Sequence, residues 1–144
     1  MASEIARDRV YGNFKPSRGE RAKTKSAKTS AADRRPGMSR DHLTLIRKLP
    51  CVACLKVPAG EAHHLKCTCQ RGMGLRSEDR HAIPLCRHDH DTIERAGAKN
   101  EISTLRSWGV DDPLQLAADL WRSTGDQPHM TRILLAHKWI GRPR

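Results

Sequence analysis

Cysteine and histidine are concentrated in one stretch of this chain, between Cys51 and Glu94. Four of the five cysteines fall between positions 51 and 69, the fifth is Cys86, and five of the eight histidines fall between positions 63 and 90. Thiolate and imidazole groups are the side chains that bind zinc and other late metal ions. The stretch therefore predicts metal binding, and we interpret it as two sites of different kinds, one structural and one chemical.

The composition is consistent with a fold that needs such support. Apolar residues make up 37% of the 144 residues, and a small core often needs a metal or a disulfide as a cross-link. An odd number of cysteines cannot all pair with one another. Residues 1–10 lack the apolar segment of a secretory leader, and no apolar run approaches the ~18 residues of a membrane span. We therefore expect metal-binding thiolates in a reducing cytoplasm.

The formal net charge of +11 favours polyanionic partners, mainly nucleic acid. Residues 1–40 hold 11 Lys and Arg against 4 Asp and Glu, and they lack apolar periodicity. This pattern predicts a disordered basic arm over residues 1–38 that binds phosphate backbones, with a solubilising tail as the alternative. The candidate DNA-binding residues are Lys15, Arg18, Arg21, Lys23, Lys25 and Lys28 in the arm, and Arg71 and Arg76 in a glycine-containing loop.

Apolar periodicity and turn signals predict an α+β fold. The expected elements are a helix from Ser39 or Asp41 to Leu49 with His42 at its surface or cap, strands over 61–65 and 82–85, a helix over 86–95, and three helices after Gly97. The order strand, loop, strand, helix forms a small ββα unit. We accordingly divide the chain into the basic arm (1–38), a ββα core (39–96) and a helical cover (97–144).

Cys51, Cys54 and Cys86 have the spacing of a structural zinc site. Two residues between Cys51 and Cys54 allow both sulfurs to bind one ion, as in zinc knuckles, and Cys86 stands at the start of a helix. A fourth ligand is expected one helical turn later, at Asp89. The alternatives for that position are His88, Cys67 and Cys69. Without a metal, the same cysteines would be small buried apolar residues.

A second set of ligands combines a strand with a helix. His63 and His64 are adjacent on the strand and therefore point to opposite faces, whereas His90 and Glu94 are four residues apart on one helical face. His63, His90 and Glu94 could hold a metal that keeps open positions, and neutral His64 could take a proton from water. Nitrogen and oxygen ligands suit Mg²⁺, Mn²⁺ or a late first-row ion. A purely structural role for these histidines is the alternative.

Short motifs occur here in a distinctive order: Leu49–Cys54, Ala62–His64, Gly72–Gly74, and Ile83–Cys86 followed by His90. Over roughly residues 41–96 the chain resembles the HNH nuclease superfamily, also called the His-Me finger or ββα-metal family. It is most similar to the zinc-stapled phage and prophage branch that includes Ref-like RecA-dependent nucleases. The resemblance implies that His63 binds the catalytic metal and that His64 is the general base. It also implies that His81, which stands where the family carries Asn, orients the base.

These patterns lead us to expect a metal-dependent DNA endonuclease that hydrolyses phosphodiester bonds with water activated by His64. Zn²⁺ would be structural, and Mg²⁺ or Mn²⁺ would be catalytic. The resemblance implies an origin in a phage or prophage, a link to recombination, and a RecA-type recombinase filament as a further partner. The alternative is a zinc-stapled nucleic-acid-binding module without catalysis, which would need only the three cysteines and their fourth ligand.

Overall fold

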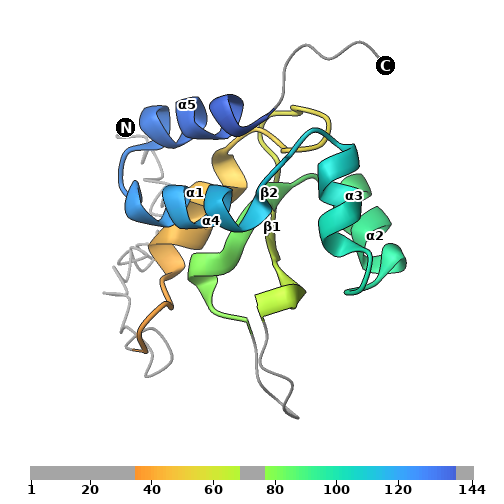
Figure 1. The fold of residues 1–144 in the computed structure, drawn as a ribbon. Helices are drawn as coiled ribbons and strands as arrows, with labels where there is room; N and C mark the ends of the chain where they lie inside the picture. The colour runs from red at the N-terminus through yellow and green to blue at the C-terminus, as the bar shows by residue number, and fades with distance from the viewer. Residues whose placement is uncertain (1–34, 69–76, 139–144) are drawn as a thin grey trace, which may run out of the picture.

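The computed structural model describes residues 35–68 and 77–138, which form a mixed α+β fold. Five α-helices, two 3-10 helices and a two-stranded sheet occur in this part of the chain (Figure 1). The elements are α1 (Arg40–Lys48), β1 (Glu61–His64), η2 (Lys66–Thr68), η3 (Asp79–His81), β2 (Ala82–Leu85), α2 (Arg87–Ala96), α3 (Glu101–Ser107), α4 (Pro113–Arg122) and α5 (Gln127–His137). The α+β class predicted from the sequence is confirmed.

Strands β1 and β2 pair antiparallel, with Glu61 opposite Leu85 and His64 opposite Ala82. All of β2 is buried, whereas His63 is the buried residue of β1. Because side chains alternate along a strand, His63 and His64 leave β1 on opposite sides of the sheet. The register therefore gives the two adjacent histidines different surroundings.

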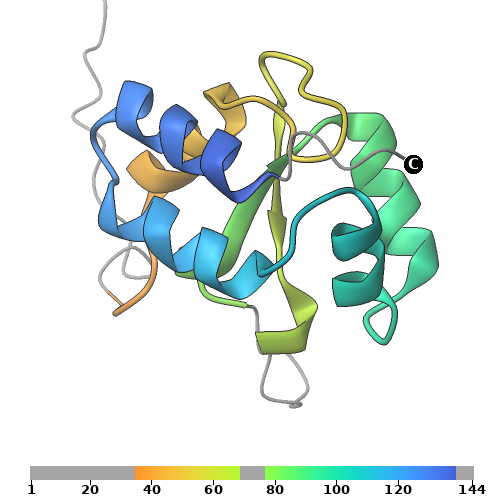
Figure 2. The same ribbon diagram turned by 45° about the horizontal axis from the view of Figure 1, so that its top comes forward.

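The sheet lies between two groups of helices (Figures 1 and 2). Helices α2 and α3 lie on one side, and α1, α4 and α5 lie on the other. Both α1 and α4 contact β2, while α2 contacts both strands. None of the described helices is long and apolar enough to cross a membrane.

Side-chain caps begin several helices, including the helix that the sequence predicted to start at Ser39. The hydroxyl of Ser39 accepts a hydrogen bond from the backbone N–H of His42 at 3.2 Å. Asp112 accepts one from the backbone N–H of Gln115 at 3.0 Å, and Pro113 follows it at the first helical position. Such caps satisfy N–H groups that have no partner within the helix.

A single buried cluster joins the predicted ββα core to the predicted helical cover. It includes Ile46 and Leu85 from the first segment, and Leu105, Leu120 and Leu134 from the second. The helices after Gly97 therefore share a hydrophobic core with the sheet.

The side chain of His42 is fully buried, in contrast to the surface or cap position expected from the sequence. Its Nδ1 lies 2.7 Å from Oγ1 of Thr124, and its ring packs edge-on against Trp121 with centroids 4.8 Å apart. The expectation of a surface position was wrong because α4 and the turn after it cover this face of α1. Local periodicity does not reveal that contact.

Several predictions concern residues outside the described ranges and stay predictions. They include nearly all of the basic arm and the loop that connects η2 to η3. The candidate DNA-binding residues there are Lys15, Arg18, Arg21, Lys23, Lys25, Lys28, Arg71 and Arg76, and Cys69 lies in the same undescribed loop.

Candidate metal centres

The first candidate centre consists of Cys51, Cys54, Cys86 and Asp89, whose ligand atoms all lie within 4.8 Å of one another. The Sγ atoms of Cys54 and Cys86 are 3.7 Å apart. One oxygen of Asp89, Oδ2, lies 3.2 Å from Sγ of Cys51 and 3.0 Å from Sγ of Cys86. Three sulfurs and one oxygen form a donor set that suits a tetrahedral zinc ion. We call these four residues the cysteine centre.

Backbone contacts hold the cysteine centre together from two sides. The N–H of Leu55 donates to the carbonyl of Cys51 at 2.9 Å, which closes the turn that carries Cys51 and Cys54. The N–H of Val52 donates to the carbonyl of Pro84 at 3.0 Å and ties this turn to β2. Cys86 is the N-cap residue of α2, and Asp89 lies in the first turn of that helix. The centre therefore connects the turn after α1 to the start of α2.

The structure brings together the three predicted cysteines and the predicted fourth ligand, Asp89. His88, the first alternative, is an exposed residue of α2 and is not part of the centre. Cys67, another alternative, lies outside the centre, and its backbone N–H donates to Glu101. The sequence left the fourth position open, and the geometry favours Asp89.

The charges of the cysteine centre favour a cation. Burial raises the pKa of the Cys51 thiol to about 12, and burial together with the neighbouring Asp89 raises the pKa of Cys86. Crowded thiols therefore resist ionisation unless a cation offsets the negative charge, and metal binding would release their protons. The ammonium group of Lys138 donates to the carbonyls of Val52 and Ala53 beside these thiols, where its positive charge complements an anionic centre.

The second candidate centre consists of His63, His90 and Glu94, again with ligand atoms within 4.8 Å of one another. We call it the histidine centre. Nδ1 of His63 lies 3.6 Å from Oε1 of Glu94, and the rings of His63 and His90 meet edge-on with centroids 5.1 Å apart. His63 is buried, while Glu94 is exposed. The sequence predicted these three residues as one ligand set, and the structure brings them together.

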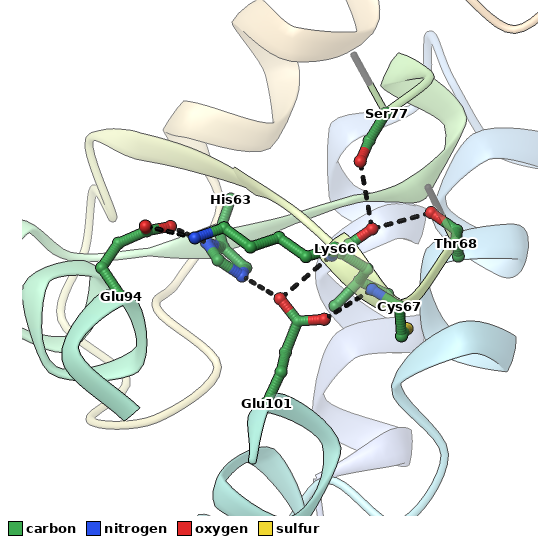
Figure 3. Close-up of polar contacts among 8 residues, drawn as sticks. His63, Lys66, Cys67, Thr68, Ser77, Glu94 and Glu101 are labelled. Atoms are coloured by element: carbon green, nitrogen blue, oxygen red, sulfur yellow. Dashed lines mark hydrogen bonds and ion pairs between the residues drawn. The ribbon is translucent and has the colours of Figure 1, made fainter. Parts of the chain in front are cut away.

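Two features of the histidine centre fit a cation. Nδ1 of His90 is buried and has no hydrogen-bond partner among the described residues, and a buried polar atom normally has one. Burial and the nearby His63 lower the pKa of His90, so the neutral, metal-binding form of the imidazole is favoured. The other side of Glu94 pairs with the ammonium group of Lys66, which follows the end of β1 (Figure 3).

Glu101, the first residue of α3, is a buried carboxylate that the sequence analysis did not identify. Its Oε1 accepts hydrogen bonds from Nε2 of His63 at 2.8 Å and from the N–H of Lys66 at 3.1 Å. Its Oε2 accepts one from the N–H of Cys67 at 3.0 Å (Figure 3). Burial alone would raise the pKa of Glu101, but these hydrogen bonds outweigh it and the pKa lies below its usual value. Glu101 is therefore held as a carboxylate beside His63.

His64 belongs to neither candidate centre, and it contacts the opposite side of the fold. Its Nε2 lies 2.9 Å from Oδ1 of Asp79, a buried residue of η3. The other oxygen of Asp79 accepts the N–H of Ser39 at 2.9 Å. The partner that orients His64 is thus Asp79 rather than His81, which corrects the expectation taken from the resemblance. The carbonyl of His81 instead accepts the backbone N–H of Leu65 at 3.0 Å.

The described residues therefore form an α+β domain with a cysteine centre, a histidine centre and a histidine–aspartate pair. In comparison with known families, the chain belongs to DUF968, a protein family described as being of unknown function, which matches residues 31–104. The matched range contains both candidate centres, Asp79 and Glu101. Neither a curated protein nor a solved structure matches the chain.

Proposed function

We propose that this protein is a metal-dependent DNA endonuclease of the HNH type. The observation that carries the proposal is the separation of two chemically different ligand sets around one ββα unit. The cysteine centre has soft, closed ligation, and the histidine centre has mixed nitrogen and oxygen ligation with an exposed member, Glu94. A pure binding module would need only the first set.

The cysteine centre would hold Zn²⁺ as a structural ion. The turn at Cys51 and Cys54 is short, and the centre joins that turn to α2. Structural zinc contributes directly to folding because the unfolded chain has no preformed site. The ion would therefore fix where α2 begins.

The histidine centre would hold Mg²⁺ or Mn²⁺ through His63, His90 and Glu94. Nitrogen and carboxylate oxygen donors suit these ions, and the partnerless Nδ1 of His90 is consistent with a ligand there. When bound, such an ion would neutralise charge on a phosphate and stabilise the leaving oxygen. Lys66, beside Glu94, adds a positive charge at the same place.

His64 would act as the general base. Its Nε2 faces the Asp79 carboxylate, so the proton sits on Nε2 and the lone pair of Nδ1 is available to accept a proton from water. His63 and His64 are consecutive, and their Cα atoms are therefore only ~3.8 Å apart. The proposal requires a phosphodiester at the end of β1 that contacts the metal held on one side of the strand and Nδ1 of His64 on the other.

The charge of the chain supports nucleic acid as the substrate. A net charge of +11 provides the sequence-independent attraction to phosphates from which most non-specific binding comes. A phage or prophage origin and a RecA-type filament as partner rest only on the resemblance to the Ref-like branch.

Cleavage of supercoiled plasmid tests the proposal. Zinc-loaded protein should nick the plasmid with Mg²⁺ or Mn²⁺, and His64→Ala should lower the rate by about 10²–10⁴-fold, the usual contribution of a general base. His129→Ala is the control, because His129 is an exposed residue of α5 outside both centres. If the wild type binds DNA but never cuts it, the binding module replaces the endonuclease. If His64→Ala cuts as fast as the wild type, the base is another group.

A further inference from the structure

Glu101 occupies a position that a carboxylate does not take without compensation. Only 1% of its surface is exposed, and a buried charge is stable only when it is paired and hydrogen-bonded. Both of its oxygens are used, by His63 and Lys66 on Oε1 and by Cys67 on Oε2. Its interactions are therefore directed at one place, the end of β1 and the turn that follows.

The hydrogen bond from His63 determines how that imidazole is presented. Nε2 must carry the proton to donate to Glu101 at 2.8 Å, so in the neutral ring the lone pair lies on Nδ1. Nδ1 is the atom that faces Glu94 in the histidine centre, 3.6 Å from its Oε1 (Figure 3). The contact with Glu101 thus selects the tautomer and the ring orientation that a metal ligand at His63 needs.

The two backbone hydrogen bonds extend this effect to the turn after β1. The N–H groups of Lys66 and Cys67 donate to the same carboxylate, that of Glu101, which is the first residue of α3. This contact fixes β1 relative to α3, and it also fixes the backbone of Lys66, whose ammonium group pairs with Glu94. One buried carboxylate therefore organises two of the side chains that meet at the histidine centre.

We propose that Glu101 is the positioning residue of the histidine centre, which holds His63 through Nε2 so that Nδ1 is presented to a divalent cation. The inference rests on the proposed function insofar as it takes His63, His90 and Glu94 to be a metal site. Carboxylates that accept the free N–H of a ligating histidine fix its tautomer and raise its basicity, and their loss typically lowers metal affinity by about 10–100-fold.

The test compares Mn²⁺ affinity in zinc-loaded wild type, Glu101→Gln and Asp119→Asn, measured from the free Mn²⁺ signal in electron paramagnetic resonance. Gln keeps the shape but removes the charge, and it places an amide N–H₂ against a backbone donor. Asp119 is the matched control, because it also pairs a carboxylate with a histidine at 2.8 Å, in this case His137, outside both centres. We expect a loss of about 10–100-fold in Glu101→Gln alone.

A second measurement does not depend on any variant folding. In zinc-loaded wild type with saturating Mg²⁺ at pH 8, ¹⁵N nuclear magnetic resonance should show the proton of His63 on Nε2. A proton on Nδ1 would overturn the proposal directly.

The outcomes separate this inference from the proposed function. If the wild type binds Mn²⁺ and Glu101→Gln binds it equally well, Glu101 has no positioning role but the metal site remains. If the wild type binds no Mn²⁺ or Mg²⁺ beyond its zinc, the histidine centre is not a metal site and both ideas fail. Retained plasmid cleavage with weakened Mn²⁺ binding in Glu101→Gln would support the inference and the metal site together.

Discussion

The burial of His42 in α1 predicts a pH dependence of folding stability, and the magnitude of this dependence follows from the structure. Thr124 Oγ1 donates to the carbonyl of Trp121 at 2.7 Å, so Nδ1–H of His42 donates to Thr124 in turn. The unprotonated Nε2 is then buried with no partner among the described residues. Adding a proton there would create a charge without an acceptor. Burial accordingly lowers the pKa of His42 from 6.5 to about 4, with a smaller opposing effect of Asp79 and a smaller reinforcing effect of His64.

The sign and the magnitude follow from proton linkage. Between these two pKa values the unfolded chain binds a proton at His42 and the folded chain does not. Folding stability therefore rises with pH across this window, and the contribution of His42 is fully present above about pH 6.5. Each pKa unit corresponds to ~1.4 kcal/mol. Acidification from pH 7.5 to pH 5 should therefore remove about 2 kcal/mol of stability through His42, and acidification to pH 4 about 3 kcal/mol.

Urea unfolding of zinc-loaded wild type and His42→Phe at pH 7.5, 6 and 5 measures this contribution. Phe keeps an aromatic ring against Trp121, cannot titrate, and leaves the Thr124 hydroxyl bonded to the Trp121 carbonyl. A packing cost of the substitution is the same at every pH, and an acid effect on the metal centres is the same in both proteins. Neither therefore changes the difference between the two pH dependences. The wild type should lose about 2 kcal/mol more than His42→Phe between pH 7.5 and pH 5. Parallel losses would refute the idea that His42 folds as a buried neutral imidazole.

Two further predictions concern the zinc and the arm. Cys86→Ser should lose the zinc of the cysteine centre and melt well below the wild type, as metal analysis and thermal melts would show. Cys67→Ser, outside that centre, should keep the zinc and the melting temperature of the wild type. Full zinc occupancy in Cys86→Ser would exclude this centre. Removing residues 1–30, which carry 8 Lys and Arg, should weaken DNA binding and reduce the dependence of log affinity on log salt. An unchanged salt slope in a DNA-binding titration would show that the arm makes no phosphate contacts.

The elements of this fold could be predicted because their signals are local. Ser39 and Asp112 stand directly before apolar periodic segments, and Gly97 follows the last turn of α2 with φ of +79°. The Cys51–Cys54 pair and the helical turn from Cys86 to Asp89 are also local signals. The sequence could therefore suggest this ligand set, although it left the fourth position open. In each case the residues that cooperate are separated by a few positions or by a recognisable motif.

The groups that orient the catalytic candidates could not be found in the same way. Asp79 lies 15 residues after His64 and Glu101 lies 38 residues after His63. Glu101 begins a helix, where a carboxylate is expected anyway because it complements the helix dipole. A glutamate at the start of a helix therefore gave no reason to expect the contact with His63. His81 was chosen because of its motif position, whereas the path of the chain before β2 brings Asp79 to His64 instead.

Helix α2 links the two candidate centres, although they share no ligand. At ~100° per residue, the pair Cys86 and Asp89 lies on average roughly 90° around the α2 axis from the pair His90 and Glu94. Side-chain atoms lie ~5 Å from a helix axis, so a rotation of only about 10° would move the ligand atoms of His90 and Glu94 by ~0.9 Å. Metal–ligand distances tolerate about ±0.2 Å. An ion in the cysteine centre would therefore set the rotation of α2 and, through it, the geometry that the histidine centre offers to a second ion.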